Sequence, residues 1–147
     1  MKLLGLDPGK TTGWALVSLE GRDLKPIDFG HDKEPSMVDQ TSHIKDADLV
    51  IIESFLVDPR YAKAGAFNYD DMIAPQVIGS LKTLCKMLDT PYVLQPASVK
   101  PVGYGFLGKT YVKGKKNMHK WDALAHICYY AVRNLDALPV KVSSSLT

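Results

Sequence analysis

The chain has 147 residues, of which 46% are hydrophobic and 23% are charged. This length allows one domain with its own core and is too short for two, and the composition excludes a disordered chain, a collagen-like repeat and a membrane-embedded body. The net charge of +2 conceals an asymmetry, because residues 1–58 carry 6 Lys/Arg and 11 Asp/Glu, whereas residues 59–147 carry 12 and 5. The asymmetry predicts an acidic site beside a surface for a polyanion; the alternative is a lysine-rich face that is merely solvated.

Two cysteines, Cys85 and Cys128, both lie in apolar sequence that is typical of helices. A secreted disulfide scaffold would carry more of them, so we expect buried, reduced thiols. No apolar run near the centre is longer than residues 49–52, and the apolar start of the chain stops at Asp7. We therefore expect a cytoplasmic protein without a signal peptide or a membrane partner.

The first part of the chain predicts three strands that form a meander. Residues 2–6 are apolar and end at Asp-Pro-Gly, residues 13–19 are rich in β-forming side chains, and residues 24–30 follow a polar turn. Residues 36–47 are a weak helix candidate. Residues 49–52 place four aliphatic side chains in a row, which is typical of a strand that is buried on both faces.

The second part predicts helices that alternate with a further strand. In order, we expect an irregular segment at 55–71, a helix at 72–88, a buried strand at 91–94, a Gly- and Lys-rich loop at 103–117, a helix at 118–134 and a frayed tail at 143–147. The helix at 72–88 carries one apolar stripe, formed by Val77, Leu81, Leu84, Cys85 and Leu88. This order predicts a mixed α/β sheet with helices on both faces, in one domain that spans residues 1–147.

Two carboxylates follow apolar strands at the end where α/β folds place their sites. Asp7 lies at the C-terminal end of the first strand, and Glu53 lies at the C-terminal end of the buried strand at 49–52. On the last helix, His119 and Asp122 are three residues apart and share one face, which His126 continues as an expected core residue. Converging carboxylates repel one another and raise each other's pKa, and a hard cation such as Mg²⁺ or Mn²⁺ relieves that repulsion.

Each of these acids also has an ordinary interpretation that the sequence leaves open. Asp7 can be the first residue of a type I turn. Glu53 can pair with Arg60 or Lys63 at the surface, and Asp122 can cap its helix or pair with a nearby lysine.

Four motifs that follow one another along the chain resemble the RuvC-type Holliday-junction resolvases. They are Gly5-Leu6-Asp7-Pro8-Gly9 with Thr12-Gly13-Trp14-Ala15, then Val50-Ile51-Ile52-Glu53, then Val99-Lys100 with Gly103-Tyr104-Gly105, Lys109 and Val112, and last His119-Lys120-Trp121-Asp122-Ala123-Leu124-Ala125. The resemblance implies an RNase H-like fold, with a central mixed five-stranded sheet made of an antiparallel meander and parallel strands. It also implies a homodimer that nicks branched DNA, the Holliday junction, with two Mg²⁺ ions in each active site.

The resemblance assigns the metal-binding and catalytic residues one by one. Asp7 matches the first acid of the family, Glu53 the second, His119 the third position and Asp122 the fourth. The family most often has Asp at the third position, so His119 departs from the pattern and favours Mn²⁺ as the better ion. The compact length resembles that of phage-encoded members.

Basic and aromatic residues supply the candidate DNA contacts. No acidic residue lies between Asp89 and Asp122, and this stretch contains Lys100, Lys109, Lys113, Lys115, Lys116 and Lys120. The lysines lead into the last helix and are placed to hold backbone phosphates. Arg60 and Lys63 stand among the aromatics Tyr61, Phe67 and Tyr69, which can stack on unpaired bases or pack the loop onto the body. Phe55 is the candidate for the aromatic that probes the junction in the family.

The helix at 72–88 is the candidate dimer interface, because Ile78 and Met87 lie outside its main apolar stripe.

Three other functions are alternatives to a junction resolvase. An actin-like ATPase needs a duplicated fold that exceeds 147 residues. An inactive RNase H-like binding module is disfavoured because all four ligand positions hold competent ligands. A related nuclease for flaps, forks or RNA stays open.

Overall fold

The computed structural model of the chain describes residues 1–33, 37–56, 60 and 72–140. The strands are β1 (Lys2–Asp7), β2 (Thr11–Glu20), β3 (Asp23–Lys33), β4 (Leu49–Ser54) and β5 (Tyr92–Pro96). The helices are α1 (Met37–Lys45), α3 (Ile73–Met87), α4 (Lys100–Phe106) and α5 (His119–Asn134), and a 3-10 turn, η2 (Ala97–Val99), precedes α4. The predicted tail at 143–147 lies outside the described residues.

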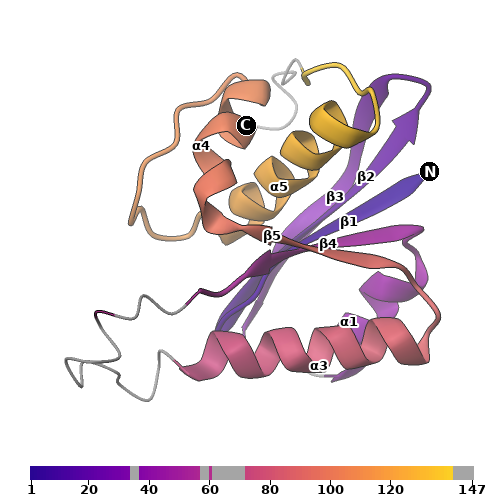
Figure 1. Cartoon of the computed structure of the whole chain (residues 1–147), viewed down its shortest axis with the longest axis vertical. Coiled ribbons are helices and arrows are strands. Elements are labelled where there is room, and N and C mark those ends of the chain that lie inside the picture. Colours follow the sequence, from indigo (N-terminus) through magenta and orange to yellow (C-terminus); the bar gives the residue numbers. More distant parts are fainter. Residues whose placement is uncertain (34–36, 57–59, 61–71, 141–147) are drawn as a thin grey trace.

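The strands form one sheet in the order β3-β2-β1-β4-β5. β1 pairs with β2 and β2 with β3 in antiparallel fashion, whereas β1 with β4 and β4 with β5 are parallel. This confirms the meander followed by parallel strands, and helices cover both faces of the sheet (Figure 1). The parallel pairs bring the carboxyl ends of β1, β4 and β5 to the same edge of the sheet.

Alternation along the strands divides the core into two layers. Leu3 of β1 and Ile51 of β4 pack in a cluster with α4 and α5. Leu4 and Ile52, their neighbours in sequence, pack in the other cluster with α1 and α3. Odd-numbered residues of β1 and β4 therefore face α5, and even-numbered ones face α3. Cys128 and Cys85 are buried free thiols in these two layers, as predicted.

Three predictions about individual elements are wrong. The strand predicted at 91–94 is present as β5, but it is not buried as predicted: it lies at the edge of the sheet, where Leu94 is 44% exposed, and its apolar sequence does not show that position. Ile78 is buried with the stripe of α3, so it does not lie outside it, whereas Met87 is 74% exposed. The predicted loop at 103–117 begins as helix α4 instead.

Gly103 explains the error at α4. Two glycines separated by one residue, Gly103 and Gly105, are typical of a loop, but Gly103 is buried where α4 packs on α5. A Cβ at Gly103 would lie 2.3 Å from the carbonyl oxygen of Ala125. Its small size thus serves helix packing and not a turn.

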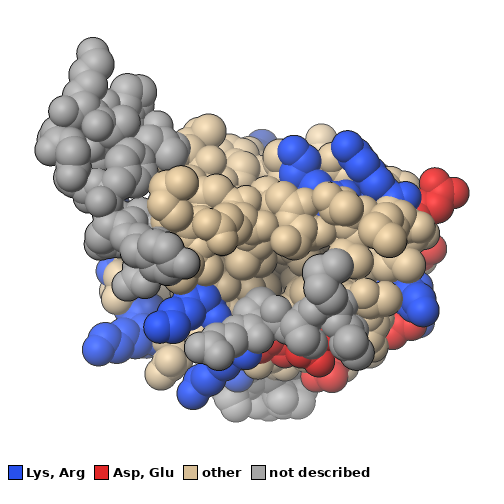
Figure 2. Space-filling model, turned by 90° about the horizontal axis from the view of Figure 1, so that it is seen from below, with Lys and Arg blue, Asp and Glu red and all other residues tan. Residues whose placement is uncertain are grey.

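The outer face of α3 is mostly uncharged. Seen from that side, Lys and Arg side chains gather toward the edges of the surface (Figure 2). Among the residues that the structure describes, no helix combines the length and apolar character needed to cross a bilayer.

Candidate active site

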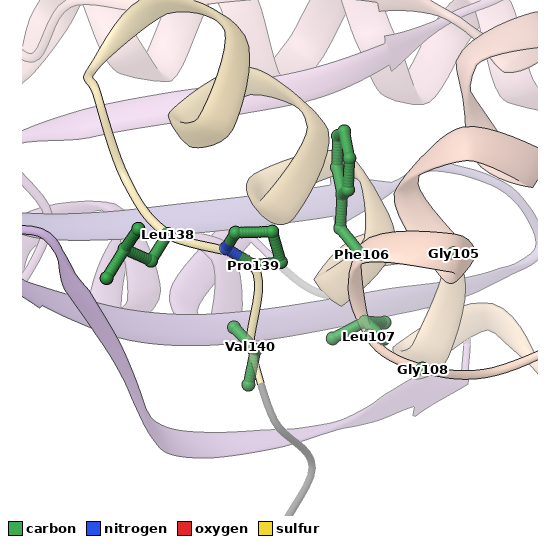
Figure 3. A pocket seen from close by; sticks show the side chains of 7 residues that line it. All are labelled: Gly105, Phe106, Leu107, Gly108, Leu138, Pro139 and Val140. Atoms are coloured by element: carbon green, nitrogen blue, oxygen red, sulfur yellow. The ribbon is translucent and has the colours of Figure 1, made fainter.

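An apolar pocket of about 520 Å³ lies where the end of α4 meets residues 138–140 (Figure 3). Its lining consists of Gly105, Phe106, Leu107, Gly108, Leu138, Pro139 and Val140. None of these side chains can accept a proton or bind a cation, whereas the carboxylates at the end of the sheet can do both.

Asp7 and Glu53 are brought together by strand register. β1 and β4 are parallel with Leu6 opposite Ile52, so the next residue of each strand is one of the two acids. Both have odd numbers and therefore face α5, on the side of Leu3 and Ile51. Asp7 is 7% exposed. This confirms that the two acids meet at one edge of the sheet.

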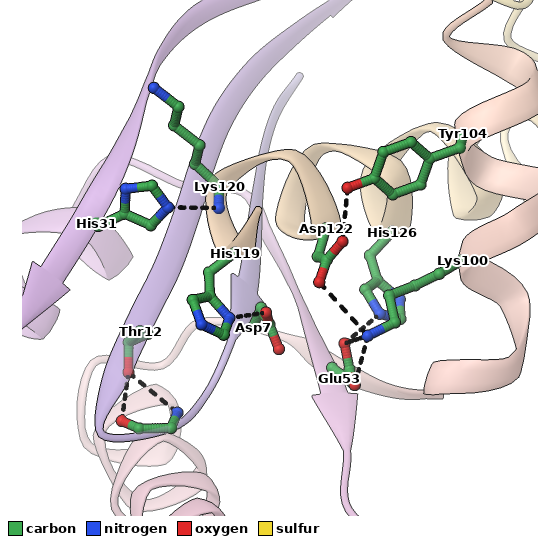
Figure 4. Close-up of polar contacts among 11 residues, drawn as sticks. Asp7, Thr12, His31, Glu53, Lys100, Tyr104, His119, Lys120, Asp122 and His126 are labelled. Atoms are coloured by element: carbon green, nitrogen blue, oxygen red, sulfur yellow. Dashed lines mark hydrogen bonds and ion pairs between the residues drawn. The ribbon is translucent and has the colours of Figure 1, made fainter. Parts of the chain in front are cut away.

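The turn after β1 is closed by a buried threonine. The Thr12 hydroxyl donates to the carbonyl oxygen of Gly9 at 3.2 Å and accepts from the Gly9 amide at 3.4 Å. These contacts fix the chain directly after Asp7 (Figure 4). The turn is thus closed by residues that follow Asp7, and the Asp7 carboxylate points into the site toward His119.

The first turn of α5 carries the other two predicted ligands, His119 and Asp122. His119 Nδ1 lies 2.7 Å from Asp7 Oδ2. His31 of β3 accepts the Lys120 amide through Nε2 at 3.3 Å, which ties the start of α5 to the sheet. Among the described residues, Asp7, His119 and Asp122 form a group whose ligand atoms all lie within 4.8 Å of one another. Carboxylates with one imidazole suit Mg²⁺ or Mn²⁺, so these residues fit such an ion.

Glu53 lies beside this group, and Lys100 lies between Glu53 and Asp122. Lys100 Nζ lies 3.2 Å from both oxygens of Glu53 and 3.5 Å from Asp122 Oδ2. The Tyr104 hydroxyl donates to Asp122 Oδ1 at 2.6 Å, and His126 Nε2 lies 2.9 Å from Glu53 Oε2. Figure 4 shows these contacts converging from β4, α4 and α5. Lys100, which we expected on phosphates, thus contacts the acids themselves.

Burial and close polar partners both shift the pKa values of the site. Burial raises the pKa of Asp7 to about 6; the charge of Glu53 adds to the rise, while His119 and Lys100 oppose it. The pKa of His119 is raised by its hydrogen bond to Asp7. Burial also raises the pKa of Glu53, but His126 and Lys100 outweigh it and hold the pKa below its ordinary value. One lysine faces three carboxylates, so the site can accommodate further positive charge.

These shifts predict how the stability of the metal-free protein depends on pH. A group with a raised pKa binds its proton more tightly in the folded chain, so its contribution is full below the ordinary value and is lost above the raised one. For Asp7 that interval runs from 3.8 to about 6, and His119 acts in the same direction. The free energy of unfolding should fall by about 1–3 kcal/mol between pH 5 and pH 8.

Urea denaturation in EDTA measures this free energy. Asp7→Asn should flatten the dependence, because it removes the buried charge. Stability of the wild-type protein that rises with pH over the same interval would contradict the assignment.

The remaining lysines lie on the surface around the start of α5. Lys113, Lys115 and Lys116 are exposed in the segment that joins α4 to α5. Lys109 Nζ lies 4.0 Å from the ring centre of Trp121, and Lys120 Nζ lies 4.8 Å from that of Phe29. The two rings contact each other edge to face at 5.1 Å between centres. Aromatic contacts thus hold two of the ammonium groups in place.

The structure describes only some of the candidate DNA-contacting residues that follow β4. Phe55 follows the end of β4 and is 38% exposed, and Arg60 is exposed. Lys63, Tyr61, Phe67 and Tyr69 lie outside the described residues. Their DNA contacts stay predictions.

The sequence comparisons find no matching protein-family model and no significantly similar curated protein. Solved structures are similar in fold. RuvC from Thermus thermophilus, in complex with a Holliday junction substrate, is 15% identical with a TM-score of 0.62, over 95% of this chain and 99% of that one. A second structure of the same protein is 16% identical with a TM-score of 0.60, over 95% and 100%. The yeast mitochondrial Holliday junction resolvase Ydc2 is 12% identical with a TM-score of 0.51, over 86% and 75%.

The chain therefore has the fold of RuvC. The match spans nearly the whole length of both chains, and the sheet order with its mixed pairing is that of an RNase H-like fold. This confirms the fold that the sequence motifs imply.

Proposed function

We propose that the protein is a metal-dependent endonuclease that nicks branched DNA, with the Holliday junction as its preferred substrate. The observation that carries this is the group of Asp7, His119 and Asp122, with Glu53 beside it, at one end of the sheet of a RuvC fold. The similar structures are named as Holliday junction resolvases or hold a Holliday junction substrate. The four residues are the proposed catalytic set.

Asp7, which contacts His119 and lies beside Glu53 in register, would be the ligand that two divalent ions share. Glu53 would hold one ion, and His119 with Asp122 the other. Bound divalent ions supply an activated water and stabilise negative charge on the phosphate and the leaving oxygen. The imidazole of His119 is a softer ligand than a carboxylate, so Mn²⁺ should support activity better than Mg²⁺.

An acidic site repels an anionic DNA strand, so the protein needs positive charge close to the site. Lys100 offsets Glu53 and Asp122 at 3.2 and 3.5 Å, which lowers their repulsion of the phosphate. Lys109 and Lys120, fixed on aromatic rings, lie around the start of α5, where they can hold phosphates on either side of the one that is cut.

Binding to junction DNA should weaken steeply as salt rises, because each phosphate contact releases a counterion. The double variant Lys115→Ala/Lys116→Ala should reduce the slope of log affinity against log salt by about 2, which is one per lost contact. Fluorescence anisotropy over a salt series measures the slope.

Lys2→Ala/Lys45→Ala removes the same charge at the start of β1 and the end of α1, at the opposite end of the sheet, and serves as the control. An affinity that does not change with salt, or a control that loses as much slope, would contradict the phosphate role.

The proposal includes a homodimer. A four-way junction has nearly two-fold symmetry, so a two-fold dimer would present one active site to each of two opposite strands. The outer face of α3, with Met87 exposed, is the candidate contact surface.

A panel of substrates tests the proposed function. Junction, flap, fork, duplex and RNA substrates would be incubated with Mn²⁺, and the ends of the products mapped. Symmetric nicks close to the crossover are expected and would also indicate two sites that act together. Preference for single-arm substrates or RNA would assign the same site to a different nuclease.

A further inference from the structure

Glu53 has a buried polar neighbour across the sheet. β4 and β5 are parallel, with Glu53 directly opposite Gln95. Partners in register point to the same face, which here is the face that α5 covers. Gln95 is 6% exposed, and His126 of α5 is fully buried. A polar pair that is so deeply buried needs a structural or functional reason.

The hydrogen bonds of Gln95 fix the orientation of its amide. Gln95 Nε2 donates to the backbone carbonyl of His126 at 3.1 Å, and a carbonyl can only accept. The amide edge that faces α5 is therefore the NH₂ group. The same nitrogen lies 2.7 Å from His126 Nδ1, so Nδ1 has to be the acceptor and carries no hydrogen.

The tautomer of His126 follows from this contact. Because Nδ1 accepts, the ring hydrogen is on Nε2, which lies 2.9 Å from Glu53 Oε2 and donates to it. The chain of contacts runs in one direction, from Gln95 through His126 to Glu53. Lys100 approaches both oxygens of Glu53, so Oε2 is held by two donors and Oε1 by one.

We propose that Gln95 and His126 are positioning residues that hold the Glu53 carboxylate in one orientation through Oε2, so that Oε1, which His126 does not engage and which accepts from Lys100, faces a divalent ion. The role rests on the proposed function, because it requires Glu53 to be a metal ligand. Hydrogen-bonded partners of this kind fix the orientation of ligating groups, and their loss costs about 10–100-fold in metal affinity. The role explains why two polar side chains are buried between the sheet and α5.

The first test is nitrogen-15 NMR of the histidine rings in the metal-free protein. His126 should show a hydrogen on Nε2 and an unprotonated Nδ1. Gln95→Glu replaces the donor by an acceptor and should move a proton to Nδ1. A wild-type spectrum with the hydrogen on Nδ1 would overturn the proposal.

The second test is calorimetric titration with Mn²⁺. Gln95→Leu and His126→Leu should each weaken binding by about 10–100-fold. His126→Gln, whose amide can still donate toward Glu53, should bind within a few-fold of the wild-type protein. A purely structural role would make the Leu and Gln variants of His126 equivalent, and that result would overturn the proposal.

Cys128→Ala changes buried packing two residues further along α5 and should leave Mn²⁺ affinity unchanged. Gln95 lies on the edge strand, so Gln95→Leu keeps the test available if His126→Leu does not fold. Unchanged affinity in folded Gln95→Leu overturns the positioning role and leaves the nuclease intact. A wild-type protein that binds no Mn²⁺ overturns both.

Discussion

Asp7→Asn should reduce cleavage of a four-way junction by about 10³-fold or more while leaving junction binding intact or tighter. A bound cation stabilises the transition state by several kcal/mol, and each 1.36 kcal/mol is a factor of about ten in rate. Asp7 is buried, contacts His119 and is close enough to Glu53 to feel its charge. Its carboxylate can therefore contribute to cation binding next to either residue. Binding is expected to persist because an amide repels a phosphate less than a carboxylate does.

Single-turnover cleavage with excess protein, together with an anisotropy measurement of binding, separates the two effects. Asp46→Asn is the matched control, since Asp46 is exposed and precedes β4 at the opposite end of the sheet. Normal cleavage by Asp7→Asn with Mg²⁺ or Mn²⁺ would refute the assignment of the site.

Gly13→Ala should destabilise the fold by about 1–3 kcal/mol, the usual cost of overpacking a close contact. A Cβ at Gly13 of β2 would lie 2.1 Å from the backbone carbonyl of His119. The contact is with backbone at the first turn of α5, so a rotamer change cannot relieve it, and α5 has to move. Because that turn carries His119 and Asp122, we also expect weaker Mn²⁺ binding.

Urea denaturation and calorimetry measure the two consequences of Gly13→Ala. Gly79→Ala on the outer face of α3 is the control, because a Cβ there would meet nothing within 4 Å. It should stabilise the protein by about 0.5–1 kcal/mol, as alanine does in a helix. Equal stability of Gly13→Ala and the wild-type protein would show that α5 does not pack on β2 in this way.

Much of the site could be predicted from the sequence because its residues are fixed by local rules. Asp7 and Glu53 each end a strand, and strand alternation places both on one face of the sheet. His119 and Asp122 share a helix face through their spacing alone. The fold followed from the same motifs, since the antiparallel and parallel pairings agree with the strand order that they imply.

What the sequence did not predict depends on contacts between distant elements. Tyr104 and Gln95 carry no local signal, because one belongs to a helix mistaken for a loop and the other to a strand predicted to end at residue 94. His126 was predicted to be a core residue and is one, but its contact with Glu53 depends on how α5 packs on β4. Lys100 was predicted to bind phosphate, but α4 places it between Glu53 and Asp122.

The most direct test of the metal-dependent nuclease is a time course with a labelled four-way junction, in Mn²⁺ and in EDTA. The account predicts paired nicks near the crossover in Mn²⁺, no product in EDTA and recovery when the metal is restored. Equal cleavage in EDTA, or no cleavage of any branched substrate by folded protein that binds Mn²⁺, would contradict it.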